Sequence, residues 1–207
     1  MEIPKSHYNI LEYGAQEGIL STAQIQAAFD AAAASGHGTV VVPAGVYLTG
    51  TINMKGASLY LEKGAVLRGS PDINDYPFYG FVHNEMGDAL SLLYTTDGEG
   101  ITISGEGTID LNGDSFYDFS KPVVPPARVS FTPTQMKECT VFYEKRPNQP
   151  IMFRRVKRLT LRGIRIINAP SWTLSFIECQ DIRVIDLTID NNLCIPNCDG
   201  MHFVSCT

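Results

Sequence analysis

The sequence lacks a hydrophobic run long enough to cross a bilayer. About 20 consecutive apolar residues are needed to span the hydrocarbon core, and no stretch of the chain approaches that length. The opening residues, Met1 to Lys5, also lack the apolar centre of a secretory signal. A membrane is therefore not an expected partner. The sequence does not determine the cellular compartment, because the protein either remains inside the cell or is exported with a signal that this sequence does not show.

Basic residues are also few. The chain has 16 Lys and Arg against 22 Asp and Glu, which gives a formal net charge of -6 at pH 7. Its densest basic run, 154–158, alternates with apolar residues and is typical of a solvated strand face. Without a polybasic block, the sequence does not predict nucleic acid as a partner.

Cysteine occurs five times, an odd number that argues against a closed disulfide framework and favours reduced, packed thiols. Four candidate metal ligands recur every four residues: Cys194, Cys198, His202 and Cys206. A proline and a glycine interrupt this stretch, and its end is typical of a strand, so the ligands would not share one helical face. We therefore predict no metal site and no cofactor.

One helix is expected over residues 22–35. Ser21 and Gln24 have the Ser-x-x-Gln spacing of a capping box. Gly36 can adopt the left-handed backbone conformation that commonly ends a helix. The apolar residues between them fall on one helical face. Because the end of a β-sheet stack needs covering, this helix is expected to cap the strands that follow it.

The rest of the chain consists of short, similar β segments punctuated by glycine. Residues 101–110, 159–168 and 182–191 align with one another, and the last two start 23 residues apart. A repeat of this kind predicts an all-β, right-handed parallel β-helix, in which each coil contacts only its neighbours. A β-sandwich is the alternative, but the segments resemble one another and no Asn-Gly hairpin turn links paired strands.

The whole chain, 1–207, is predicted to be one incomplete β-helix domain. Residues 112–150, rich in proline and aromatic residues, break the repeat. Insertions in repeat proteins often emerge on one face and form a binding wall. Within and before this stretch, Asp110, Asp114 and Asp118 are expected to be solvated turn residues rather than calcium ligands.

Five segments, taken in order, carry a resemblance to a known family: 8–15, 38–47, 105–110, 168–174 and 197–200. With them the sequence resembles glycoside hydrolase family 28, the polygalacturonases and their relatives. The most specific match is the last segment, Asn197-Cys198-Asp199-Gly200, which stands where the family carries an Asn-Thr-Asp-Gly motif.

This resemblance implies inverting hydrolysis of glycosidic bonds in pectic polysaccharides, with Asp199 as a carboxylate that engages the nucleophilic water. Its partners in the family are an Asp-Asp pair one coil later, then Gly-His-Gly and Arg-x-Lys segments. None of these occurs before Thr207. Because inversion needs a separate acid and base, we expect this chain alone to have little or no hydrolase activity, and its open coil end to favour self-association.

Three further residues are candidate substrate-binding groups. Asn197 either orients Asp199 and contacts sugar or serves as a turn residue. His202 stands where many polygalacturonases have an acidic residue, so the substrate need not be a simple galacturonan; alternatively it is a structural histidine. Trp172, the only tryptophan, either stacks on a sugar ring or packs between coils.

Two other functions remain compatible with a β-helix. One is a module that binds glycans without catalysis, because a solenoid groove survives the loss of one catalytic group. The other is a polysaccharide lyase, which the Asn197–Gly200 motif and the lack of clustered acidic residues disfavour. The sequence does not specify the oligomeric state.

Overall fold

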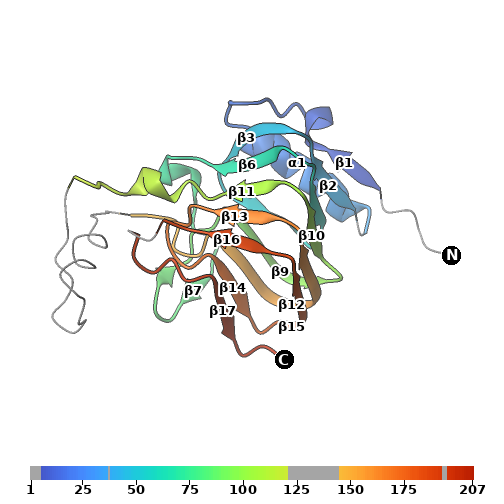
Figure 1. The fold of residues 1–207 in the computed structure, drawn as a ribbon. Coiled ribbons are helices and arrows are strands. Elements are labelled where there is room, and N and C mark those ends of the chain that lie inside the picture. Colours follow the sequence, from blue (N-terminus) through green and yellow to red (C-terminus); the bar gives the residue numbers. More distant parts are fainter. Residues whose placement is uncertain (1–5, 37, 121–144, 193–194) are drawn as a thin grey trace.

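The computed structural model describes residues 6–36, 38–120, 145–192 and 195–207. Its strands wind into successive coils, and strands of successive coils pair in parallel (Figure 1). The only antiparallel pair in this described part joins β7 (Val82–His83) to β8 (Gly87–Asp88). The prediction of a parallel β-helix is confirmed, and the β-sandwich alternative is wrong.

The coils have three faces. The first face contains β4 (Ile52–Asn53), the start of β9 (Leu93–Glu99), the start of β12 (Ile151–Arg162), β14 (Leu174–Ile177) and β17 (Met201–Val204). The second contains β1 (His7–Asn9), β2 (Thr39–Val42), β5 (Ser58–Leu61), β10 (Thr102–Gly105), the end of β12 and β15 (Gln180–Ile185). The third contains β3 (Gly45–Thr49), β6 (Ala65–Gly69), β11 (Thr108–Asp110), β13 (Arg165–Ile167) and β16 (Thr188–Asp190).

Strand β12 belongs to two faces because it turns a corner. Arg155 and Arg158 have left-handed φ values of 51° and 53°, and such residues bend a strand away from its plane. The residues before the corner pair with β14, and those after it pair with β15. Ion pairs to Asp97 and Glu99 of the preceding coil hold the two arginines at the surface.

Inward-pointing side chains form ladders along the stack. Phe153, Phe176 and Phe203 occupy one register position in successive coils, and neighbouring rings stack with centroids 5.7 and 4.8 Å apart. Phe153 and Phe176 are fully buried, whereas Phe203, in the last described strand of this face, is 54% exposed. The core therefore consists of layers of side chains, and each layer is buried by the layer of the neighbouring coil.

Helix α1 (Thr22–Ala34) covers the amino-terminal coil, as predicted, with a buried face that includes Ile25 and Phe29. The predicted capping box is wrong. The Ser21 hydroxyl makes no cap bond; it accepts from Gln16 N at 3.1 Å and donates to Ile19 O at 3.0 Å. The preceding loop thus satisfies this hydroxyl, and a capping bond is not formed.

The aligned repeats pair largely as their sequences predict. Thr102 lies beside Thr160, in agreement with the alignment, but Ile109 lies beside Ile166 rather than Ile167. The turn after Gly105 is one residue longer than its counterpart in the next coil. Gly105 has a φ of 124°, and a Cβ there would clash with the carbonyl oxygen of Leu61, so the turn requires glycine.

Asp110 is not the solvated turn residue that we expected. Its side chain is 4% exposed and lies 2.9 Å from Arg68 Nε. It also accepts hydrogen bonds from Asn112 N and from Asn168 Nδ2 of the next coil. Buried carboxylates persist when they are paired in this way, so Asp110 joins three coils. Asp114 does lie at the surface, where Asn192 Nδ2 donates to it at 2.9 Å.

Two predicted features lie partly outside the described residues. Of the expected insertion over 112–150, the structure describes 112–120, which includes the short helix η3 (Gly113–Phe116), and 145–150. Of the five cysteines, Cys139 and Cys194 are not described, and Cys179, Cys198 and Cys206 are free thiols. Among the described residues, no helix has the length and hydrophobicity of a membrane span.

Candidate active site

The candidate site lies on the outer side of the first face. Side chains alternate along each strand, so Met152, Ser175 and His202 share one register row that points outward, next to the inward row that contains Phe153 and Phe176. The turns that precede β14 and β17 open onto this side. They carry Trp172 and Asp199.

Backbone hydrogen bonds place Asp199 beside the turn of the preceding coil. Thr173 N donates to the Asp199 carbonyl at 2.9 Å, and Leu174 N donates to the Gly200 carbonyl at 3.2 Å. The parallel ladder thus extends into the turn before β17. The Asp199 side chain is 60% exposed, and its Oδ2 lies 3.2 Å from Nε2 of His202. The separation suits an ion pair, but the angles do not make a hydrogen bond, which leaves His202 Nε2 without a hydrogen-bond partner.

Trp172 is the centre of an aromatic group. The His202 ring stacks on the indole with centroids 3.9 Å apart and an interplanar angle of 18°. His83, from β7, meets the indole edge-on at 5.3 Å. Desolvation by burial lowers the pKa of His83, partly offset by Glu85. Trp172 therefore does contact the next coil, and it remains half-buried rather than fully enclosed.

The structure thus brings together three of the four residues that the sequence singled out, namely Asp199, His202 and Trp172. The fourth, Asn197, has a left-handed φ of 62° in the same turn. Its side chain is exposed, and no hydrogen bond joins it to another described residue. This geometry fits a turn asparagine, and it also leaves the amide free for a ligand.

Arg146 links the two turns that carry the site. Its guanidinium donates to the carbonyls of Pro170 at 2.7 Å and Pro196 at 3.0 Å, and it contacts the Tyr117 hydroxyl. The residue is 6% exposed, and burial lowers its pKa to about 10. Sequence reasoning missed Arg146, because no motif marks it and its contacts come from distant segments.

Asn191 forms a second link between these turns. Its side chain accepts from Ala169 N and donates to Thr173 Oγ1 and the Cys198 carbonyl. Cys198 in turn donates to the Ala169 carbonyl at 3.0 Å, and burial raises the pKa of its thiol to about 12. The cysteine of the Asn197–Gly200 motif is therefore a packed thiol that faces the preceding coil.

The chemistry available here is that of one exposed carboxylate beside an imidazole and an indole. A carboxylate can activate a water molecule, and an indole face can receive the apolar side of a sugar ring. Inverting hydrolysis also needs a second carboxyl group about 6.5–9.5 Å from the first.

Comparison with protein families gives a match to the model described as glycosyl hydrolases family 28, over residues 33–207. An exopolygalacturonase of Platanus acerifolia is 26% identical over 207 positions, which cover 95% of this chain and 46% of the relative. A probable polygalacturonase of Vitis vinifera is 25% identical over 181 positions, which cover 83% of this chain and 33% of the relative. The chain thus spans less than half the length of these two relatives.

Solved structures share the fold. A hyperthermoactive exopolygalacturonase from Thermotoga maritima aligns with a TM-score of 0.74 at 21% identity, over 99% of this chain and 52% of that one. A polygalacturonase from Erwinia carotovora aligns with a TM-score of 0.71 at 21% identity, over 100% of this chain and 54% of that one. At this level of identity the likeness shows the β-helix and not the substrate.

Proposed function

The chain belongs to glycosyl hydrolases family 28, and we propose that it supplies the substrate-binding face and one catalytic carboxylate for hydrolysis of glycosidic bonds in pectic polysaccharides. The observation that carries this proposal is the position of Asp199. Its carboxylate is exposed on the outer side of a parallel β-helix, in the same group as Trp172 and His202. An aspartate sealed inside the coil could do no chemistry on a polymer.

Each residue has a distinct proposed role. Asp199 accepts a proton from the water molecule that attacks the anomeric carbon, as a general base does in inverting hydrolysis. Trp172, which is half-buried, offers the exposed part of its indole to a sugar ring, and His202 stacks on the indole and holds it in place. His202 also places its imidazole near the sugar, where the ring can hydrogen-bond to an acidic group. Asn197 donates from its exposed amide to a sugar hydroxyl.

The 207-residue chain by itself should bind such a polymer without cleaving it. General acid catalysis at the leaving oxygen needs a second carboxyl group, and the group described around Trp172 contains only one, that of Asp199. Binding needs only the outer face, which the described coils contain.

Calorimetry and a reducing-sugar assay test this proposal together. We expect heat of binding with polygalacturonate and none with a neutral galactan of similar length, and no release of reducing ends from either. Failure to bind polygalacturonate would refute the substrate class. Release of reducing ends would refute the claim that the chain lacks an acid.

A glycan-binding module without catalysis is the second candidate, favoured by the presence of a single carboxylate, Asp199, in the group formed with Trp172 and His202. The coding sequence beyond the codon of Thr207 separates the two candidates. An Asp-Asp pair within one further coil would support the hydrolase. A stop codon at that point would support the binding module.

A further inference from the structure

Much of the outer side of the first face is covered, although it should be open if a polymer were to lie along it. Met152 and Ile177 point outward by alternation with their inward neighbours, yet they are 0% and 6% exposed. Neither belongs to the hydrophobic cluster inside the coils. Some other segment must therefore bury them from the outside.

Segment 79–83 lies against the outer side of this face, and its alternate side chains reach successive coils. Tyr79 stacks on Tyr94 of β9 with centroids 3.8 Å apart. Phe81 lies under the guanidinium of Arg154 in β12 at 5.0 Å, and His83 meets Trp172, just before β14, at 5.3 Å. The segment therefore crosses the strands in the direction of the β-helix axis. A polysaccharide that contacted successive coils, about 4.8 Å apart, would follow the same path.

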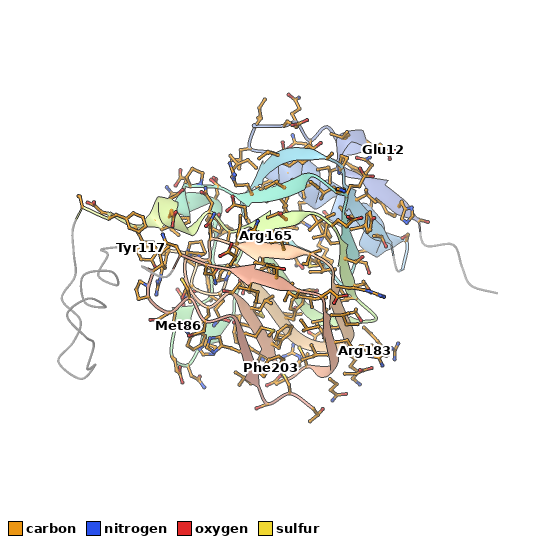
Figure 2. The ribbon with its side chains drawn as sticks, viewed as in Figure 1. Glu12, Met86, Tyr117, Arg165, Arg183 and Phe203 are labelled. Carbon is orange, nitrogen blue, oxygen red and sulfur yellow. The ribbon has the colours of Figure 1, made fainter. Side chains whose placement is uncertain are left out.

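Hydrogen bonds hold this segment and the hairpin that continues it: Tyr79 Oη lies 2.9 Å from Ser91 Oγ, and Ala89 N donates to the Phe81 carbonyl at 2.9 Å. Asn148 donates to the carbonyls of Met86 and Asp88 and accepts from Leu90 N, with distances of 2.8 to 2.9 Å. These bonds anchor the β7–β8 hairpin, which in Figure 1 lies beside β14 and β17. In Figure 2, Met86 and Phe203 of β17 lie in the same lower part of the molecule, whereas Glu12 of η1 (Ile10–Tyr13) lies at the opposite end. The cover is thus a built part of the fold.

The cover ends where the candidate site begins. His83 touches Trp172, Trp172 stacks on His202, and His202 lies 3.2 Å from Asp199. At this end, Ser175 Oγ is buried without a hydrogen-bond partner, and so is Nε2 of His202. Buried polar atoms are normally bonded. Both atoms lie beside Trp172 and Asp199, at the end of segment 79–83.

We propose that segment 79–83 fills the amino-terminal part of the substrate groove, so that the site around Asp199 accepts the end of a polysaccharide chain and not its interior. This inference rests on the proposed function, because it presumes that pectic polymers bind this face. According to this inference, Tyr79, Phe81 and His83 determine whether the site binds the end of a polymer or its interior.

The length dependence of binding tests the inference. Trp172 is the only tryptophan, so its fluorescence reports on the site directly. We expect the dissociation constant, expressed per mole of polymer chains, to change less than about twofold from the tetramer of galacturonate to a chain of about twenty sugars, because each chain has one acceptable end. An open groove would instead tighten binding on the order of tenfold over that range, since a long chain offers many overlapping sites. That result would overturn the inference and leave the proposed function intact. No binding at any length would overturn both.

A double variant, Tyr79→Ser with Phe81→Ser, tests the assigned residues. Removal of both rings should open the groove and produce the length dependence that the wild-type protein lacks. Tyr60→Ser, which alters an exposed tyrosine on the second face, is the matched control and should behave like wild type. If the double variant folds and its dissociation constant still does not depend on the length of the polymer, the assignment to these residues is overturned. If the double variant fails to fold, as judged by its circular dichroism, the wild-type length series decides the inference.

Discussion

At the residue scale, the properties of Asp199 come from its neighbours. Its carboxylate is exposed, but its backbone is fixed by a ladder bond to Thr173, and the two turns around it are joined by Arg146 and Asn191. A group held in this way loses little further freedom when it meets a ligand. Rigid turns on stacked strands therefore suit a catalytic carboxylate.

The charge of Asp199 should oppose the binding of an acidic polymer. We expect Asp199→Asn to strengthen binding of tetragalacturonate by about twofold to fivefold, because it removes a like charge near the ligand. Calorimetry measures the change. Asp186→Asn, an equal change of charge in a turn between the second and third faces, should leave binding unaltered. Weaker binding in the Asp199 variant alone would contradict the proposed placement of the substrate.

His83 should make the stability of the fold depend on pH. Burial lowers its pKa below the ordinary value of 6.5, so the unfolded chain binds the proton more tightly than the folded chain. Stability is then present above pH 6.5 and is lost as the pH falls through the folded pKa. We expect the free energy of unfolding in urea to fall as the pH is lowered below about 6.5, and His83→Gln to reduce that fall. His7→Gln, on the second face, is the control. An identical slope in wild type and His83→Gln would disprove the effect.

The sequence could predict some of these residues and not others. Asp199, Asn197 and Trp172 lie in segments that resemble those of a family, and His202 lies two residues after the last of these segments. Tyr79, Phe81 and His83 lie in no repeat, and Arg146 follows an irregular stretch. Their importance comes from contacts between residues well separated in sequence, such as that of Phe81 with Arg154. Spacing along the chain does not encode such contacts.

At the scale of elements, the fold depends on ladders of like side chains. The Phe153, Phe176 and Phe203 column shows the principle, since the rings of Phe153 and Phe176 are each stacked on the ring of the next coil and fully buried. Strand positions were predictable because apolar residues alternate and recur from coil to coil. The corner in β12 was not predictable, because the left-handed conformations of Arg155 and Arg158 have no signature in residue type.

Two positions of that column should differ sharply in their contribution to stability. Phe176→Ala removes a fully buried ring and should lower the free energy of unfolding by about 3–5 kcal/mol. Phe203→Ala removes a ring that is 54% exposed, and it should cost about 1 kcal/mol. Chemical denaturation of both variants gives the comparison. Equal losses would show that the layers do not depend on their neighbours as described.

At the scale of the whole molecule, the two ends of the stack differ. Helix α1 covers the amino-terminal coil, whereas β17 pairs with β14 alone among the described strands. Met201 and Phe203 of β17 are 42% and 54% exposed. An unpaired strand edge with apolar side chains is a template for pairing with another chain.

The 207-residue chain should therefore associate with itself through β17. We expect its sedimentation coefficient to rise with concentration, and Phe203→Lys to weaken that dependence by placing a charge at the exposed edge. Tyr60→Lys, on the second face, should not weaken it. A sedimentation coefficient that stays constant at the monomer value over the accessible concentration range would contradict this expectation.

Hydrogen exchange with and without tetragalacturonate tests the central claim most directly, because it maps where an acidic glycan binds. We predict slower exchange in peptides that cover 170–175 and 198–204, the two turns and strands that carry Trp172 and Asp199. Peptides that cover 39–42 and 58–61 should not change. Protection confined to the second face, where a hollow of about 420 Å³ is lined by His7 and Tyr60, would contradict the account.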